Sequence, residues 1–411
     1  MKKHRVVVTG MGVITPIGAT VAVFRDRLLA GISGVGPITL FDPASLPTRI
    51  AAEAEMPRDV PTHRDRKVAF LLFAAEQALK DATTNDTRPG GGAAGISVGM
   101  GLELFSMPDM ISYRQPGFQL PESLADRLTF LQTPADLGAH LLSKIHGMHA
   151  PPIVHVSACA AGTDAIGTAY RLVATGRRRW MLAGGSDSMI NPMGMAGFCK
   201  LGAMSRRNDE PTRASRPFDR HRDGFVIGEG AGMLVLETRE DALARGAAIH
   251  AEIVGYGNSF DAHGISEPHP EGRGAFQAMS RALADAGIEP ADLDCVNAHG
   301  TSTPKNDPVE TLAIKRLLGE RAAKTPICST KSMIGHLIAA AGAVEAIAAI
   351  ACMQVGQVHP TINLEEPDPA CDLDYVPGRS RLHPQRYALS NSFGFGGQNA
   401  SLVLHLPSPV D

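Results

Sequence analysis

Three short segments of this sequence carry side chains that could perform chemistry together. Cys159 lies between an apolar run and a run of small residues, and His299 precedes a Gly-Thr-Ser-Thr stretch. Lys331 and His336 are the first and last residues of a third small-residue segment. One thiol with two separate imidazoles is the set of groups used for acyl transfer through a thioester. The residue types therefore predict an acyl-transferring enzyme.

The surroundings of Cys159 favour a reactive thiol over a structural one. Free cysteines are most often buried packing residues, and Cys352, inside an apolar helical run, fits that description. Cys159 instead follows an apolar strand and precedes an Ala-Ala-Gly run, so we expect it to begin a helix. A helix N-terminus lowers the pKa of a thiol and presents backbone N–H groups to an anion. Those N–H groups can also form half of an oxyanion hole.

The histidines and Lys331 lie in glycine-containing turns where a solvated surface position does not explain them. His299 is followed by glycine, and His336 is preceded by one. Lys331 heads a segment that leads into an Ala-rich helix, and Glu345 falls within that helix. A carboxylate among apolar residues needs a cationic partner. We expect the partner of Glu345 to be Lys331 or His336.

Composition limits the class of protein. The chain has 411 residues, 44% of them hydrophobic, and a formal net charge of -3, which predicts a large core and argues against a nucleic-acid binder. Its six cysteines form no CxxC pair and no Cys/His cluster, which argues against disulfides and metal sites. We expect no cofactor and a cytoplasmic location. The longest apolar run, residues 337–353, contains Glu345 and predicts a buried helix, not a membrane span.

Short β-branched runs alternate with Ala/Leu-rich stretches, which is typical of an α/β protein with buried sheets. A glycine-rich turn followed by an apolar strand occurs at residues 225–237 and again at residues 393–404. This repeat suggests two similar halves that meet near residue 250. The expected strands are residues 6–9, 96–100, 153–157, 181–183 and 233–237, and the expected helices are residues 66–82, 163–175, 274–286, 309–318 and 339–352.

These motifs together resemble the β-ketoacyl-[acyl carrier protein] synthases, closest to the long-chain elongating type II condensing enzymes of fatty acid synthesis. The resemblance implies a duplicated thiolase-like fold with five layers, α-β-α-β-α. In that arrangement residues 1–250 form the half with the cysteine, and residues 251–411 form the half with the two histidines. The matching motifs extend over the whole chain and comprise residues 8–12, 157–162, 216–219, 223–225, 299–304, 331–336 and 391–397.

The resemblance also implies how the central groups act. Cys159 would take the acyl group from a carrier-protein thioester. His299 and His336 would decarboxylate a malonyl thioester and stabilise the enolate through Nε2–H donors, a task suited to neutral imidazoles. The enolate would attack the acyl group, with the oxyanion between the backbone N–H groups of Cys159 and Phe395.

Supporting roles follow from the same resemblance. Lys331, with Glu345 as its partner, would set the electrostatics of the site. Thr301 and Thr303 resemble the hydroxyls that contact the pantetheine arm. Phe395 resembles a gate that swings when the cysteine is acylated, and the glycines beside it supply backbone freedom.

The expected partner is an acyl carrier protein, which is acidic and needs a basic patch to dock. Arg66 and Lys67, and also Arg206, are the candidates for that patch. The cluster at residues 177–179 is denser, but it lies between a helix and a strand and fits a structural turn. We expect a homodimer, or a heterodimer with a chain-length factor.

Three other functions share part of this pattern. One is the ketosynthase subunit of a type II polyketide pathway, which has the same architecture. A second is its non-catalytic chain-length partner, which the presence of Cys159, His299 and His336 opposes. The third is a thiolase, which uses a second cysteine near the C-terminus, where this chain has Phe395 and its neighbours. Decarboxylating condensation is therefore the predicted reaction.

Overall fold

Ten strands form one mixed sheet at the centre of the computed structural model, which describes residues 3–58, 60, 63–84, 87–89 and 94–407. The strand order is β10-β9-β13-β14-β8-β1-β7-β6-β4-β5. The first five strands along the chain are β1 (Val6–Ile14), β4 (Ala94–Met100), β5 (Ile153–His155), β6 (Trp180–Asp187) and β7 (Gly230–Thr238). The other five are β8 (Ala251–Phe260), β9 (Cys295–Asn297), β10 (Ile327–Cys328), β13 (Tyr387–Gly394) and β14 (Gln398–His405).

The sheet is built from two copies of one five-stranded pattern. In the first copy β5, β4 and β6 are parallel, while β7 and β1 are antiparallel to their neighbours. In the second copy β10, β9 and β13 are parallel, while β14 and β8 are antiparallel. The copies are joined by antiparallel pairing of β1 with β8 over three residues. This duplication is the one that the repeated glycine-turn-strand segments predict. The predicted boundary at residue 250 falls just before β8 and stays a prediction.

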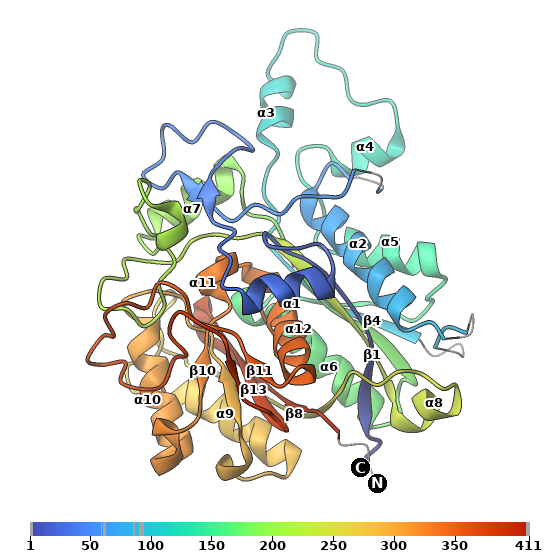
Figure 1. The fold of residues 1–411 in the computed structure, drawn as a ribbon. Helices are drawn as coiled ribbons and strands as arrows, with labels where there is room; N and C mark the ends of the chain where they lie inside the picture. The colour runs from blue at the N-terminus through green and yellow to red at the C-terminus, as the bar shows by residue number, and fades with distance from the viewer. Residues whose placement is uncertain (1–2, 59, 61–62, 85–86, 90–93, 408–411) are drawn as a thin grey trace.

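Helices complete the five layers. Figure 1 shows α2 (Arg66–Asp81) and α5 (Leu137–His146) outside the first half of the sheet. Between the two halves lie α6 (Ala161–Ala174) and α12 (Ala341–Gln354), which contact each other and strands of both halves. Outside the second half lie α9 (Arg273–Ala286) and α10 (Asn306–Leu318). The predicted α-β-α-β-α fold is therefore confirmed.

The chemistry of each central element explains its place. All but the last residue of α12 are buried, because Ala, Ile and Val cover every side of this helix and both neighbouring layers are protein. The outer helix α2 packs closely on β1, where a side chain on Gly12 would come within 2.0 Å of the Ala74 carbonyl oxygen. Only glycine allows that approach. The ten expected strands and helices are all found, although β1 continues to Ile14 and β6 to Asp187, beyond the expected ends at residues 9 and 183.

The remaining elements are short. None of the described helices is long and apolar enough to span a membrane. The short helices not named above are α1 (Val21–Leu29), α3 (Met107–Tyr113), α4 (Leu124–Thr129), α7 (Pro192–Lys200), α8 (Arg239–Ala244) and α11 (Lys331–Ile334). Two small antiparallel pairs join β2 (Gly36–Pro37) with β3 (Ile50–Ala51), and β11 (Gln357–Val358) with β12 (Arg381–Leu382).

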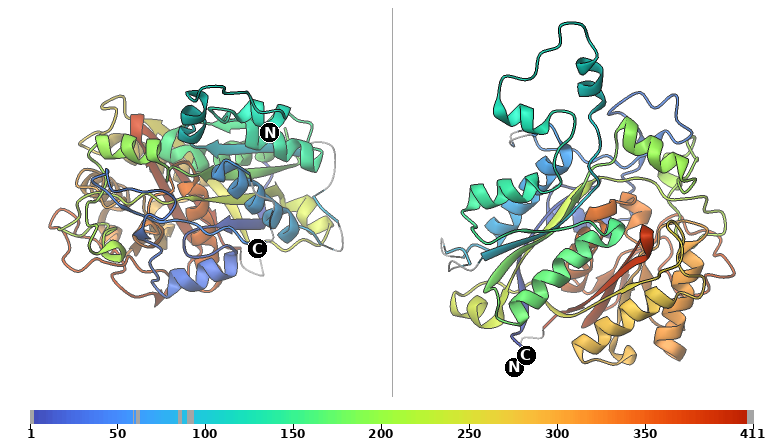
Figure 2. Two further views of the ribbon diagram at one scale, coloured as in Figure 1. Left: turned by 90° about the horizontal axis from the view of Figure 1, so that it is seen from above. Right: turned by 180° about the vertical axis from the view of Figure 1, so that it is seen from behind.

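One segment stands away from the layers. Residues 101–136, which carry α3 and α4, project above the sheet in Figure 1 and again from behind in Figure 2. A bridge between Phe105 and Gln132 closes the base of this projection. Its large apolar side chains are exposed in the single chain, among them Leu102, Phe105, Ile111, Tyr113, Leu124 and Leu128.

Candidate active site

Cys159 lies in a tight turn between β5 and α6. The turn is a short 3-10 helix, Ala158–Ala160, and Ala158 has a φ of +49°, which non-glycine residues rarely adopt. The surrounding structure must hold such a conformation in place. It buries the thiol and directs two backbone N–H groups toward the sulfur, those of Phe395 and of Cys159 itself. An oxyanion formed on an acyl group at this sulfur can therefore meet two donors.

The expectation of an acidic thiol at a helix N-terminus is wrong. The regular helix α6 begins at Ala161, two residues after the cysteine. Burial raises the pKa of Cys159 to about 11, and the Phe395 N–H and the charge of Lys331 only partly oppose that rise. The free-energy cost of burying a thiolate away from water exceeds the stabilisation that the nearby N–H donors and Lys331 provide.

The two histidines come from separate loops and meet over the cysteine. The sulfur of Cys159 and one ring nitrogen each of His299 and His336 lie within 4.8 Å of one another. The ring centroids of His299 and His336 are 5.3 Å apart, and their planes meet at 82°. This edge-to-face arrangement lets both rings point a nitrogen at the space above the sulfur. The structure thus brings together the three groups that the sequence singled out.

Hydrogen bonds assign the tautomer of His336. The backbone N–H of Ile338 donates to Nδ1 of His336 at 3.1 Å. Nδ1 is therefore the unprotonated acceptor nitrogen, and Nε2 carries the proton. Nδ1 of His299 has no partner among the described residues, so a proton there would find no acceptor, which favours Nε2–H in that ring too. Burial first, and then the charge of Lys331, hold the pKa of both rings well below 6.5. Both imidazoles are therefore neutral donors near pH 7.

Two buried carboxylates, neither of them among the predicted site residues, hold the His299 loop. Glu310 accepts the backbone N–H groups of His299 and Gly300, each at 2.8 Å. Asp307 accepts the Thr301 N–H at 3.1 Å. Both side chains are buried on α10. The available signal was a pair of acidic residues three positions apart on a helix face that otherwise holds Ala, Ile and Leu.

The partner of Glu345 is Lys331. The Lys331 ammonium, on α11, forms a hydrogen-bonded ion pair with the Glu345 carboxylate on α12, and each side chain is only 1% exposed. His336, the other expected candidate, bonds elsewhere through its ring. Burial raises the pKa of Glu345 to about 7, against the opposing charge of Lys331. The pair places a fixed positive charge beside two imidazoles and a thiol.

A cavity of about 200 Å³ leads from the surface to these groups. Thr301 and Thr303 stand on one wall, with their hydroxyl oxygens 2.9 Å apart. Phe395 is half-buried between Gly394 and Gly396, and Gly396 has a φ of +78°, a conformation that glycine adopts without strain. The lining includes Cys159, Ala203, Phe225, Glu267, His299, Thr301, Thr303, Lys305, His336, Phe393 and Phe395.

Comparison with known proteins identifies the family. The family model described as "Beta-ketoacyl synthase, N-terminal domain" matches residues 3–242, and "Beta-ketoacyl synthase, C-terminal domain" matches residues 250–365. The chain belongs to the β-ketoacyl synthase family. Among curated relatives of this synthase, 3-oxoacyl-[acyl-carrier-protein] synthase 2 of a Synechocystis strain is 44% identical, over 98% of each chain. The protein of that name from Coxiella burnetii is 41% identical, over 98% of this chain and 99% of its own.

Solved structures agree with that assignment. A β-ketoacyl synthase from Burkholderia phymatum has a TM-score of 0.87 at 38% identity, over 98% of this chain and all of its own. A type II polyketide ketosynthase, solved with its acyl-carrier protein and a bound hexaketide, has a TM-score of 0.88 at 34% identity, over the same shares. The synthase described here is therefore an acyl-transferring condensing enzyme with the thiolase-like fold.

The structure changes the expected carrier-docking patch. Lys67 is buried and pairs with Asp65 at 3.0 Å. Arg66 is two-thirds buried and forms an ion pair with the fully buried Glu229. Both side chains are needed inside the fold, because each balances a buried or half-buried carboxylate. The prediction that they receive a carrier protein is wrong for Lys67, which is buried, and stays a prediction for Arg66. Arg206 is exposed and stays a prediction.

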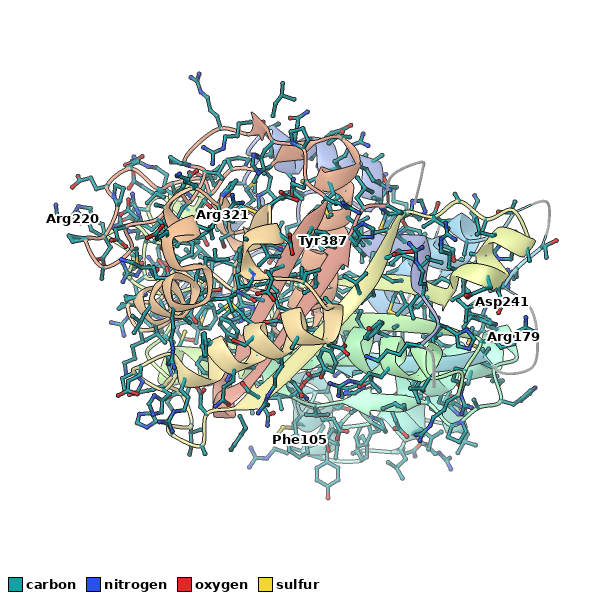
Figure 3. The ribbon with its side chains drawn as sticks, turned by 90° about the horizontal axis from the view of Figure 1, so that it is seen from below. Phe105, Arg179, Arg220, Asp241, Arg321 and Tyr387 are labelled. Atoms are coloured by element: carbon teal, nitrogen blue, oxygen red, sulfur yellow. The ribbon has the colours of Figure 1, made fainter. Side chains whose placement is uncertain are left out.

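Two other charged segments are structural. Arg179, in the 177–179 cluster, pairs with Asp241 (Figure 3), which agrees with a structural turn. The loop at residues 206–222 is rich in charged residues, yet residues 214–219 are buried, including Phe218 and Asp219. Asp219 accepts three backbone N–H groups there, so this loop belongs to the core.

Among the residues that the structure describes, Cys159, His299 and His336 are also the one cluster with the spacing of a metal site. One thiolate and two imidazoles are ligands that Zn²⁺ accepts. Zn²⁺ would bind the thiolate form of Cys159. The ion would then occupy the sulfur and the two ring nitrogens that acyl transfer uses.

Proposed function

We propose that this synthase joins an acyl group held on Cys159 to the malonyl group of malonyl-[acyl carrier protein], with loss of CO2. The products are β-ketoacyl-[acyl carrier protein] and, from the first half-reaction, a free carrier. The pathway is fatty acid elongation, and the location is the cytoplasm. No metal or cofactor takes part in this scheme.

In the first half-reaction Cys159 exchanges its proton for an acyl group. The sulfur attacks the carbonyl carbon of an acyl-carrier thioester, and the carbonyl oxygen accepts hydrogen bonds from the backbone N–H groups of Cys159 and Phe395. When the carbon–sulfur bond to the carrier breaks, the carrier thiolate takes up the proton. Because the free thiol has a pKa of about 11, deprotonation coupled to the attack is favoured over a standing thiolate.

In the second half-reaction His299 and His336 act on the malonyl thioester. Its carbon–carbon bond to the carboxylate breaks, CO2 leaves, and the electron pair forms an enolate. Two neutral Nε2–H groups donate to the enolate oxygen, which is where negative charge develops. The enolate carbon then attacks the acyl carbon on Cys159, and the released sulfur regains a proton from solvent.

One observation carries this proposal: two uncharged imidazoles and a thiol meet within 4.8 Å, with two backbone N–H groups on the sulfur. A thiolase would need a second cysteine in this space. The cavity instead holds Phe393 and Phe395. Burial, and to a smaller extent the positive charge of Lys331, keep both rings neutral.

The cavity wall suits the carrier's pantetheine arm. Thr301 and Thr303 offer hydroxyl groups to its amides, and Phe395 acts as the gate between that arm and the acyl chain. Arg206, exposed just after the lining residue Ala203, receives the acidic carrier protein at the cavity mouth.

The test follows Cys159 by intact mass. The parent should gain an acyl group from an acyl-carrier thioester. Cys159→Ala should gain none, yet should still convert the malonyl thioester to the acetyl thioester, since the histidines remain. Cys352→Ala, at a buried helical cysteine away from the cavity, is the matched control and should acylate normally. An acyl adduct that persists in Cys159→Ala would contradict the proposal.

A second subunit covers the projection at residues 101–136. Its exposed apolar side chains, such as Ile111 and Leu124, are 56% and 71% exposed in the single chain, and apolar patches of this kind mark interfaces. A homodimer fits the fatty acid pathway. The alternative is a ketosynthase subunit of a type II polyketide pathway with a chain-length factor. It is supported by a neighbour described as the ishigamide ketosynthase/chain length factor, with a TM-score of 0.86 at 34% identity.

Product analysis separates these two pathways. The purified chain alone should elongate acyl carriers if it works as a homodimer in fatty acid synthesis. Condensation only after a homologous partner is added, with polyketide products by mass spectrometry, would favour the alternative.

A further inference from the structure

A buried carboxylate outside the catalytic set touches the turn that follows His336. Asp187 is the last residue of β6 and is fully buried. One of its oxygens accepts the backbone N–H of Ala339 at 3.0 Å, and the other accepts that of Ser188 at 2.8 Å. Gly101 makes room for the carboxylate, since a side chain on that glycine would come within 2.1 Å of it. The site is thus shaped around this one acidic group.

The turn that Asp187 holds is strained. The short 3-10 helix at Ile338–Ala340 begins with Ile338 at a φ of +45°, which is a genuine outlier for a β-branched residue. Two peptide planes meet at the Cα of Ile338. One plane donates its N–H to Nδ1 of His336, and the other donates the Ala339 N–H to Asp187. The two hydrogen bonds together fix the rotation between the planes.

The turn is held from the other side as well. A side chain on Gly185 would come within 2.6 Å of the Ala339 carbonyl oxygen, and one on Gly162 within 2.8 Å. The absence of side chains on Gly185 of β6 and Gly162 of α6 therefore leaves just enough space for the Ala339 carbonyl group. Ile338 itself is buried in the cluster that contains Cys159. The turn has no room to relax while Asp187 keeps its hydrogen bond.

We propose that Asp187 is a positioning residue for His336: by anchoring the Ala339 N–H, it keeps Ile338 in its strained conformation and so holds the Ile338 N–H on Nδ1 of the ring. This contact makes Nε2 the protonated nitrogen and aims it at the cavity. The inference rests on the proposed function, because it assigns His336 the donor role in decarboxylation.

Without the anchor, Ile338 returns to negative φ and its N–H turns away from the ring. His336 can then carry its proton on either nitrogen, and only one of the two tautomers can donate to an enolate. Cys159 takes its N–H donors from its own backbone and from Phe395, and the negative charge of Asp187 only opposes ionisation of the thiol, so losing that charge removes no donor from the sulfur. Loss of Asp187 should therefore affect the two half-reactions unequally.

The variant Asp187→Asn keeps the size of the side chain, but an amide offers only one oxygen to two N–H groups. We expect the rate of decarboxylation of the malonyl thioester at saturating substrate to fall about 10- to 100-fold, which is the rate loss typical of a misplaced catalytic group. The KM should stay near the parent value, and acylation of Cys159 should stay within about threefold on the same reasoning. In 15N-histidine NMR spectra, His336 should change from one tautomer, with a bare Nδ1, to a mixture. The His336→Ala spectrum identifies its resonance.

Asp219→Asn is the matched control, because Asp219 is also a buried carboxylate that accepts backbone N–H groups. It should change both half-reactions by the same factor. If Asp187→Asn does not fold, Gly185→Ala presses on the Ala339 carbonyl while leaving Asp187 intact, and it should give the same unequal loss.

Equal loss of acylation and decarboxylation in Asp187→Asn, or an unchanged His336 tautomer, would overturn the inference. A parent protein that does not decarboxylate malonyl thioesters would instead overturn the proposed function. In that case the NMR readout still decides whether Asp187 controls the ring.

Discussion

Replacing Lys331 by methionine should destabilise the protein strongly, because it leaves Glu345 alone in the core. Both side chains are 1% exposed. Removing one partner of a buried ion pair typically costs about 3–5 kcal/mol, since the remaining charge is unpaired. In the parent, burial already moves the pKa of Glu345 from 4.5 to about 7, which corresponds to about 3 kcal/mol of preference for the protonated form.

The loss in Lys331→Met should grow with pH. Without the lysine charge, the pKa of Glu345 in the folded state rises further above its value in the unfolded chain. When a carboxyl group has a higher pKa in the folded protein than in the unfolded chain, the protein is most stable below the unfolded pKa. That stability is lost as the pH rises through the pKa of the folded state. The variant should therefore lie closer to the parent at pH 5 than at pH 8.

Urea unfolding gives the free energies, with Trp180 as the probe. It is the single tryptophan of the chain and is buried in β6. The double variant Lys331→Met, Glu345→Leu should recover most of the loss, because well-packed apolar replacement of a buried ion pair is often nearly neutral. A double variant as unstable as the sum of the two single variants would refute the reasoning, since independent sites add.

Further expected outcomes concern the reacting groups and the cavity mouth. His299→Ala and His336→Ala should each slow condensation about 10²–10³-fold, the scale of one oxyanion donor, while acylation persists by intact mass; near-parent condensation would make that ring structural. The rate of alkylation of Cys159 by iodoacetamide should rise about tenfold per pH unit from pH 7 to 9.5, because burial raises the pKa of the thiol to about 11. A plateau near pH 8 would contradict the raised pKa. Micromolar Zn²⁺ should inhibit acylation reversibly to EDTA, and His299→Ala should weaken that inhibition; equal inhibition of both would place the ion elsewhere. Arg206→Glu should raise the KM for carrier-bound substrate but not for small pantetheine thioesters. Arg177→Glu, which lies beyond the C-terminal end of α6, is the control and should change neither KM. An equal rise in KM for both substrate types in Arg206→Glu would argue against docking.

Local patterns were enough to predict the elements and most of the site. Alternating apolar runs fixed the strands, and the buried Glu345 required a cation, which limited its partner to two residues. The structure selects Lys331. The choice could not be made from spacing alone, because His336 is as near along the chain and its ring orientation depends on the strained turn at Ile338.

Predictions that needed three-dimensional surroundings were the ones that failed. Lys67 looks like a surface charge at the start of a helix, yet β6 and the loop after β4 cover it. The acidity of Cys159 was predicted from its place before a helix, but the depth of burial outweighs that effect. Asp187 could not be singled out from the sequence, because a single acidic residue at the end of a strand has no distinctive local pattern.

The position of β1 has a consequence for how the chain is made. It is synthesised long before its two neighbours, which are β7, where Thr238 lies opposite Val6, and β8, where Ile253 lies opposite Val6. Translation must therefore reach Ile253 before β1 has both of its hydrogen-bonding neighbours. Until then, the apolar residues of β1 and β4 have no complete sheet to join. We expect nascent chains that end before β8 to depend on chaperones, because pairing over such sequence separations forms late.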